Sequence, residues 1–274
     1  MPEIVIPVIV LGACVGSFLN VVMYRLPKKK SFVLERSHCP SCNKNLNVID
    51  LFPIISWIFL KGKCRYCKTS ISKRYPLVEL ITSTLFLICL ECKGYVDDTL
   101  PAYYMFISGW LLVSYLIVLF IIDLDEMILP NSLTYSGSVV GLSLISYQCL
   151  ISYDSSYEIL FEHFFAFLIA IFGIGFISFI IKLIIKKPAL GGGDAKLFAL
   201  SGAWLGLDGL EVTITLSFLV SALFVISGLI LGLIKRGEYI PFGPYICVSI
   251  FLVWFYGPQF WFDSLGDIFW WKYL

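Results

Sequence analysis

Long apolar runs recur along almost the whole chain and constrain its fold more than any other feature. Runs bounded by charged residues predict membrane spans near residues 4–24, 76–92, 102–122, 132–151, 160–185, 195–208, 211–234 and 240–257. A bilayer core of about 30 Å needs roughly 17–25 helical residues, and most of these runs are long enough. Because 59% of the residues are apolar and only 14% are charged, the chain lacks the polar surface of a soluble domain. We expect an all-α polytopic membrane protein with about eight transmembrane helices.

The distribution of basic residues predicts the topology. If all eight spans cross, every Lys and Arg except Lys93 and Lys272 falls on one side of the membrane. The positive-inside rule then assigns that side to the cytoplasm and both termini to the opposite side. The sixth span, 195–208, is short enough to be a re-entrant segment, but omitting it would move Lys235 and Arg236 to the other face. Its small residues predict a helix packed closely among its neighbours: Ala199, Ser201, Gly202 and Ala203.

The predicted spans divide the chain into four parts. A first transmembrane helix (1–24) is followed by a polar cytoplasmic insert (25–75), a transmembrane core (76–257) and a tail (258–274). The tail is rich in Trp and Phe, which predicts an aromatic anchor at the outer membrane interface. His163, at the start of the fifth span, is expected to be interfacial.

Four cysteines of the insert have metal-ligand spacing. Cys39-Pro-Ser-Cys42 and Cys64-Arg-Tyr-Cys67 form two CxxC pairs separated by 21 residues, close to the spacing of zinc ribbons. A reducing cytoplasm disfavours disulfides, and an insert of this size gains stability from a metal. Paired disulfides or a redox-active CxxC remain the alternative, although a thioredoxin-like βαβ context is absent. A third pair, Cys89 to Cys92, ends the second span on the opposite face and is not expected to join this site.

Two carboxylates lie at the ends of predicted spans rather than in loops. Asp123 closes the third span and Asp194 opens the sixth, both at the predicted cytoplasmic face. Ionisable groups at membrane depth are costly, usually face the bundle interior, and indicate function. Two carboxylates sharing a site hold one proton between them, as in aspartic proteases, so that one activates water and the other polarises a carbonyl. Asp125 is the main rival to Asp123.

Spacing alone supports catalysis and structure about equally. In the structural interpretation, Asp194 is a helix cap and Asp123 is a boundary residue. The preceding glycines, 191–193, permit irregular backbone and close approach of another chain, and a helix N-terminus favours the Asp194 anion. Buried carboxylates also serve proton-coupled transporters.

Several motifs, in order, resemble those of the prepilin peptidases, or type IV leader peptidases, of the GxGD aspartyl protease class. They are GSFLNVVMYRLP (16–27), the two CxxC pairs, KGKCRYC (61–67), ISKRYPLVE (71–79), IIDLDEMILPN (121–131), LGGGDAKL (190–197), GAWLG (202–206) and IPFGPY (240–245). The resemblance covers nearly the whole chain. It implies that Asp123, separated by six residues from Pro130, and Asp194 are the catalytic pair. The family often has Asp after that proline, whereas this chain has Asn131.

The resemblance also implies an activity and its accessory residues. The enzyme would cleave the short basic leader of type IV prepilins or type II secretion pseudopilins at the cytoplasmic face of the bacterial inner membrane. It would then N-methylate the new terminal residue with S-adenosylmethionine. Three residues of the segment LGGGDAKL are expected to support the active site: Gly191, Gly193 and Lys196. Three others are expected to take part in methyl transfer: Gly62, Lys63 and Glu79.

Two other functions stay open at this point. One is a presenilin-like GxGD intramembrane protease with a different substrate. The other is a non-enzymatic, zinc-anchored transporter or scaffold that uses its aspartates for ion coupling. The insert with the RYPLVE and PFGP segments argues against the first. Membrane lipids are expected partners and nucleic acid is not, and the sequence gives no indication of an oligomeric state.

Overall fold

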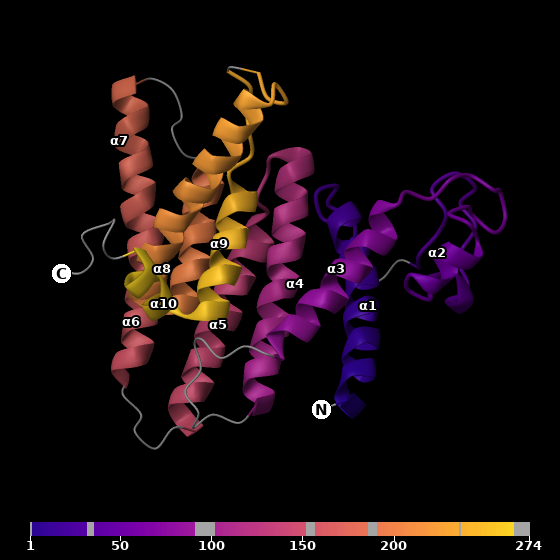
Figure 1. The fold of residues 1–274 in the computed structure, drawn as a ribbon, viewed down its shortest axis with the longest axis horizontal. Helices are drawn as coiled ribbons and strands as arrows, with labels where there is room; N and C mark the ends of the chain where they lie inside the picture. The colour runs from indigo at the N-terminus through magenta and orange to yellow at the C-terminus, as the bar shows by residue number, and fades with distance from the viewer. Residues whose placement is uncertain are drawn as a thin grey trace. The chain divides into compact units, whose positions relative to one another are not determined.

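The chain folds almost entirely into helices (Figure 1). The computed structural model describes residues 2–31, 36–90, 102–151, 157–185, 191–235 and 237–265. Its elements are α1 (Pro2–Arg25), η1 (Val48–Leu51), α2 (Ile55–Phe59), α3 (Arg74–Cys89), α4 (Ala102–Glu126), α5 (Asn131–Ile151), α6 (Tyr157–Leu168), the π-helical η2 (Ile169–Ile174), α7 (Gly175–Ile185), α8 (Gly192–Ile230), α9 (Gly243–Tyr256) and α10 (Pro258–Leu265). Within the described residues, extended pairing is limited to two isolated bridges in the insert. The predicted all-α class is confirmed.

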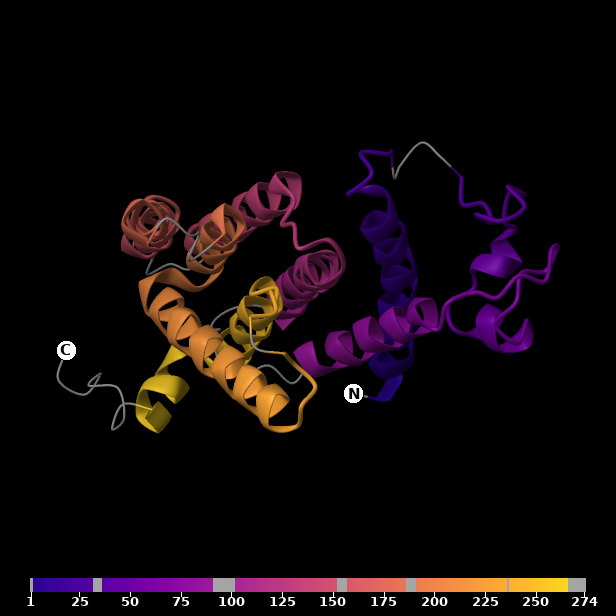
Figure 2. The ribbon, with the colours of Figure 1, turned by 90° about the horizontal axis from the view of Figure 1, so that it is seen from above.

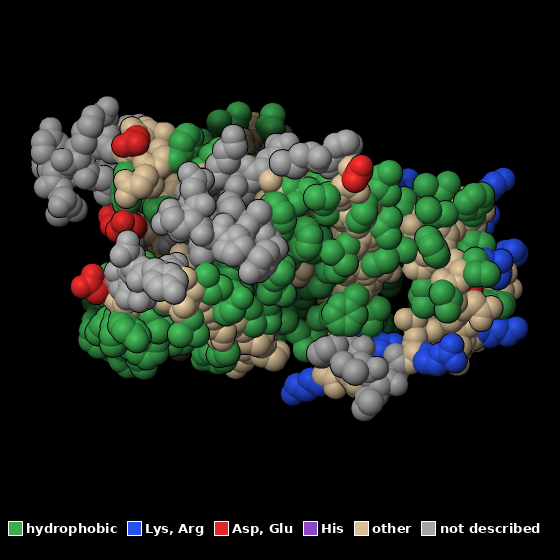
Figure 3. All heavy atoms as spheres, turned by 90° about the horizontal axis from the view of Figure 1, so that it is seen from below, with side chains coloured by type: hydrophobic (Ala, Val, Ile, Leu, Met, Phe, Trp, Pro, Cys, Tyr) green, Lys and Arg blue, Asp and Glu red, His purple; other side chains and the backbone are tan. Residues whose placement is uncertain are grey.

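The chain forms two compact units. Unit 1 comprises residues 1–91 and 109–118, and unit 2 comprises residues 92–108 and 119–274. Seen from below, apolar side chains cover much of the surface, while Lys and Arg side chains gather mainly over the insert (Figure 3). A largely apolar exterior with clustered basic residues is typical of a membrane protein.

Four described helices are long and apolar enough to cross a bilayer: Glu3–Arg25, Phe106–Glu126, Tyr157–Ile181 and Gly192–Ile230. The α9–α10 pair, bent by 97°, makes a fifth if it forms one broken span. Eight crossings therefore remain a prediction. Some of the basic residues from which the topology is predicted lie outside the described residues: Lys93, Lys186, Lys187, Arg236 and Lys272. Cys92 and the tail beyond residue 265 lie outside them as well.

The predicted sixth and seventh spans are the two arms of α8. Gly206 interrupts the helix with φ 71° and ψ −166°, a backbone conformation that favours glycine. In a straight helix, Phe198 and Phe218 would be about 30 Å apart. Instead both pack on the ring of Phe242, with ring centroids 6.3 and 5.2 Å from it. The helix therefore folds back at Gly206, and the two arms are seen as separate orange segments in Figure 2.

The first arm of α8 is tightly packed. Its small residues are buried, as predicted: Ala199, Ser201, Gly202 and Ala203. A Cβ on Gly202 would lie 2.7 Å from the backbone of Ala166 in α6. The Trp204 indole donates to the Gly137 carbonyl at 2.9 Å. His163 is 2% exposed, with Nδ1 3.3 Å from the Ala203 carbonyl, because α6 packs directly against this arm. Its position at the membrane interface stays a prediction.

In unit 1, α1 and α3 cross at two glycines. A Cβ on Gly12 would lie 2.6 Å from the Cα of Ser83, and one on Gly16 would lie 2.7 Å from the Cα of Glu79. Two small residues one helical turn apart let membrane helices approach at the backbone. The Ser83 hydroxyl adds a 3.1 Å hydrogen bond to the Ile9 carbonyl across the same crossing. This contact presses Glu79 against α1.

Candidate active site and metal centre

Asp123 is fixed at the start of α9. It lies near the end of α4, is 5% exposed, and its Oδ2 accepts a 2.9 Å hydrogen bond from the Gly243 backbone N–H. Gly243 is the first residue of α9, so this N–H is one of those that a helix leaves without an internal partner. A carboxylate is favoured there by the helix dipole. A Cβ on Gly243 would lie 2.5 Å from Asp123 Oδ2, so the contact requires glycine.

The structure separates Asp123 from its rival. Asp125 and Glu126 are exposed at the end of α4, whereas Asp123 is buried. A helical step of two residues turns the side chain to the opposite face, which accounts for the difference. Asp123 therefore faces the protein interior near the end of its helix.

Asp194 lies in the first turn of α8. Its Oδ2 accepts a 2.9 Å hydrogen bond from the N–H of Gly191, the N-cap residue, which is one of the two hydrogen bonds of a capping box. The capping role considered for Asp194 is thus present, at the third residue of the helix. Its side chain is half-buried and lies within electrostatic range of Asp123. Capping and catalysis are compatible, because the bond engages only one carboxylate oxygen.

Two contacts join the segments that carry the aspartates. Figure 1 shows that α4 ends and α5 begins at the same end of unit 2 at which α7 ends and α8 begins. A Cβ on Gly193 would lie 3.1 Å from the Cβ of Leu129, in the α4–α5 connection. The Lys196 ammonium donates to Asn131 Oδ1 at 2.6 Å. The chain thus brings both carboxylates, the GxGD glycines and Lys196 into one region.

The sequence interpretation gives no role to Gly243, Leu129 or Asn131. Gly243 belongs to the quoted segment IPFGPY, in which a glycine before a proline at a helix start signals a constrained backbone. Asn131 stands out in the sequence only as a departure from the family pattern. Its amide oxygen is the acceptor for Lys196, a position where an aspartate would form an ion pair.

The four predicted cysteines converge in unit 1. The Sγ atoms of Cys39, Cys42, Cys64 and Cys67 all lie within 4.8 Å of one another, and those of Cys39 and Cys67 are 3.8 Å apart. Tetrahedral zinc with Zn–S bonds of about 2.3 Å places its sulfurs about 3.8 Å apart. None of the four is in a disulfide. The donor set and its spacing therefore fit zinc.

Each CxxC pair belongs to the same kind of turn. The N–H groups of Cys39 and Cys64 donate to the carbonyls of Lys44 and Thr69, at 3.0 and 2.8 Å. One residue after each pair has positive φ, 54° at Asn43 and 60° at Lys68. The Thr69 hydroxyl, 3.3 Å from Cys67 Sγ, and its backbone N–H lower the pKa of this thiol to about 6. Although the Lys44 N–H lowers the pKa of Cys42, desolvation and the neighbouring Cys39 and Cys67 thiols raise this pKa to about 11, so Cys67 ionises before Cys42.

The residues expected in methyl transfer lie in three different environments. Glu79 is 6% exposed and its Oε2 accepts a 2.7 Å hydrogen bond from the Ile54 N–H. Gly62 has φ 67° and is covered by the Trp57 ring, whereas Lys63 is exposed. A cavity of about 410 Å³ in unit 1 is lined by Glu79 and Trp57 but by neither Gly62 nor Lys63.

Comparisons with known proteins identify the family of the chain. The bacterial peptidase A24 N-terminal domain matches residues 10–92, and the type IV leader peptidase family matches residues 110–226. The prepilin leader peptidase/N-methyltransferase of Aeromonas salmonicida is 33% identical, over 90% of this chain and 89% of its own length. The protein of that name from Pseudomonas aeruginosa is 34% identical, over 92% and 90%.

The type 4 prepilin-like proteins leader peptide-processing enzyme of Escherichia coli is 34% identical, over 87% of this chain and 88% of its own length. No solved structure matches the chain. Relatives of this identity extend over most of both sequences, and the two family models match its two halves in order. The chain therefore belongs to the type IV leader peptidase family.

Proposed function

We propose that this protein is a membrane aspartyl endopeptidase that removes the leader of type IV prepilins or type II secretion pseudopilins. The observation that carries the proposal is the convergence of Asp123 and Asp194 on one end of unit 2, through Gly243, Leu129 and Asn131. The names of the relatives supply the substrate class. The distribution of basic residues supports a site at the cytoplasmic face of the bacterial inner membrane.

The two carboxylates have different roles in peptide hydrolysis. The ionised member accepts a proton from water as the water oxygen attacks the scissile carbonyl, and the protonated member donates to the carbonyl oxygen. The proton then passes to the departing amine. The Gly243 N–H holds Asp123 in place without a positive side chain, so the pair keeps its single shared negative charge. Gly191, Gly193 and Lys196 support the site by setting the position of Asp194 and joining α8 to α5.

We assign a function to each of the four parts of the chain that the sequence predicts. The core at 76–257 performs proteolysis, the insert at 25–75 binds a structural Zn²⁺ through its four cysteines, and residues 1–24 and 258–274 anchor the protein in lipid. The relatives' names support N-methylation of the new N-terminus. We assign this reaction to the insert, with S-adenosylmethionine as the methyl donor. Glu79 and Gly62 are better placed for this second reaction than the exposed Lys63.

Purified protein in detergent with a synthetic leader-bearing pilin peptide tests the proposal. Asp123→Asn and Asp194→Asn are each expected to abolish cleavage while methylation of a pre-cleaved peptide survives. Asp125→Asn, which changes an exposed carboxylate two residues away, is the matched control and should cleave at the wild-type rate. Full proteolysis by both single variants would exclude the catalytic pair, and a transporter or scaffold would cleave nothing.

A further inference from the structure

Unit 1 contains a cavity with the dimensions of a small-molecule site. Its volume is about 410 Å³, and its walls come from α1, from the start of α3 and from the cysteine-bearing insert. Pockets for small ligands range from roughly 300 to 1,000 Å³ and combine apolar walls with a few polar groups. Trp57, Tyr24 and Tyr75 provide aromatic walls, and Glu79 provides a carboxylate. Arg25 also lines the cavity, and its guanidinium donates to the backbone carbonyls of Ser31 and Arg36.

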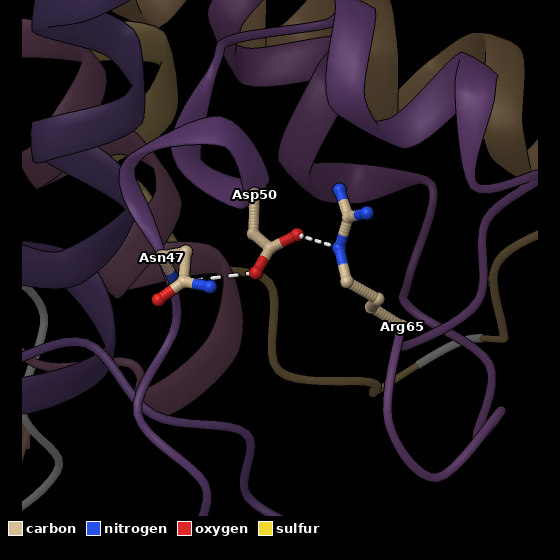
Figure 4. Close-up of polar contacts among 3 residues, drawn as sticks. All are labelled: Asn47, Asp50 and Arg65. Atoms are coloured by element: carbon tan, nitrogen blue, oxygen red, sulfur yellow. Dashed lines mark hydrogen bonds and ion pairs between the residues drawn. The ribbon is translucent and has the colours of Figure 1, made fainter.

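Of the two acidic residues that line the cavity, Glu79 has no partner of opposite charge among the described residues. Its partners are the Ile54 N–H and the Ser17 hydroxyl, both neutral. Asp50, on the same cavity wall, is paired with Arg65 at 2.5 Å and also accepts from the Asn47 N–H (Figure 4). A buried carboxylate without a cation is costly, and a bound cation would offset that cost.

The position of Glu79 is rigidly determined from two sides. The close approach of Gly16 sets α3 against α1. On the insert side, Ile54 donates its N–H from a backbone with φ 58°, a region that β-branched residues rarely adopt. Strain of this kind persists where surrounding contacts hold it and gathers at ligand sites. The carboxylate is therefore built into the cavity wall by both halves of unit 1.

The position of Trp57, which forms part of the aromatic wall, also depends on neighbouring residues. The Trp57 indole donates to the Ile71 carbonyl at 3.2 Å, and its ring covers Gly62. A Cβ on Gly62 would lie 2.8 Å from Trp57 Cζ2, so any larger residue there would push the ring. Gly62 therefore shapes the cavity without lining it. Aromatic faces beside a carboxylate attract small organic cations, including methylated ones.

We infer that this cavity binds the methyl donor, a sulfonium compound, and that Glu79 compensates the sulfonium charge. This inference rests on the proposed methyltransferase function. When bound, such a donor supplies a methyl group to the new N-terminal amine: a C–N bond forms and the amine loses its proton to water. The sulfur keeps the electron pair of the broken S–C bond and becomes a neutral thioether. Since the positive charge disappears on transfer, Glu79 distinguishes donor from product.

Isothermal titration of the full-length, zinc-loaded protein in detergent tests this charge discrimination. The ligands are S-adenosylmethionine and its neutral product S-adenosylhomocysteine. Wild-type protein should prefer the sulfonium compound by roughly tenfold, as expected for one charge-assisted contact. Glu79→Gln should remove the preference, while retaining an oxygen that can accept from Ile54. Glu3→Gln, which removes an exposed carboxylate of α1, is the matched control and should keep the preference.

The remaining outcomes are distinct. If Glu79→Gln keeps the sulfonium preference, or weakens both ligands equally, the carboxylate does not meet the sulfonium and the inference fails. Methyl transfer to a pre-cleaved peptide is measured on the same samples. If the wild-type protein transfers a methyl group but Glu79→Gln does not change ligand binding, the cavity assignment is rejected and the methyltransferase function is still supported. Wild-type protein that neither binds the donor nor transfers a methyl group rejects both.

Discussion

Asp123, near the end of α4, accepts a 2.9 Å hydrogen bond from the backbone N–H of Gly243, 120 residues later in the chain. The donor is at the start of α9 and has no acceptor within its own helix, and the bond orients a carboxylate that is almost completely buried. It uses one carboxylate oxygen, Oδ2, and no hydrogen bond to Oδ1 is found among the described residues. The family segment IPFGPY thus contributes directly to the position of a predicted catalytic group.

Gly243→Ala should inactivate the peptidase. Its methyl group would lie 2.5 Å from Asp123 Oδ2, so the carboxylate has to move. Displacement of a reacting group by about 1 Å can cost about 100-fold in rate, and we expect a loss of that order in kcat/KM for a leader peptide. Gly175→Ala, where a Cβ meets open space within α7, is the control. A Gly243→Ala variant that cleaves as fast as the control would show that this contact does not set the Asp123 geometry.

Adjacent glycines of the GxGD motif should respond differently to the same substitution. A Cβ on Gly193 would lie 3.1 Å from Leu129, whereas one on Gly192 would meet nothing within 4 Å. Gly193→Ala should therefore separate α8 from the α4–α5 connection and reduce cleavage, because extra atoms in a packed contact force the backbone apart. Gly192→Ala should retain wild-type rates. Equal rates for the two variants in a leader-peptide assay would contradict this packing.

The bond between Lys196 and Asn131 should contribute modestly to stability. Lys196→Met removes a 2.6 Å hydrogen bond between partly exposed groups, and we expect a loss of about 1 kcal/mol in the free energy of unfolding. Asn131→Asp converts the contact into an ion pair and should be neutral or stabilising. A double-mutant cycle in detergent measures the coupling. If Asn131→Asp has the same effect in the wild-type background as in the Lys196→Met background, the two side chains do not interact.

Removing metal should affect the insert and spare the aspartates. Cys42→Ser deletes one of four converging thiols and should lower the bound zinc, measured by elemental analysis, and increase proteolysis within 36–75. Cys14→Ser changes an exposed thiol of α1 and serves as the control. Unchanged zinc in Cys42→Ser would exclude this ligand set. A strong chelator should reproduce the effect of Cys42→Ser in wild-type protein.

Sequence alone predicted the elements and the chemistry-bearing residues. Apolar runs predicted the helices because burial in lipid selects composition over a length set by the bilayer. The CxxC spacing predicted the clustering of the four cysteines because each pair forms a local turn. The ordered motifs selected Asp123 over Asp125 as the catalytic residue, and this choice stays a prediction; the structure buries the first and exposes the second. Hydropathy did not reveal that the first arm of α8 covers His163, since it does not show which helix packs on a given face.

Only the tertiary structure decided which distant groups meet. The fold-back of α8 at Gly206, the bond from Gly243 to Asp123, and the bond from Ile54 to Glu79 each depend on how separate segments pack. Periodicity and spacing are local properties of the sequence and do not predict a contact between residues 120 positions apart. The sequence therefore determined that two aspartates and four cysteines are available for chemistry, and helix packing determined what surrounds each of them.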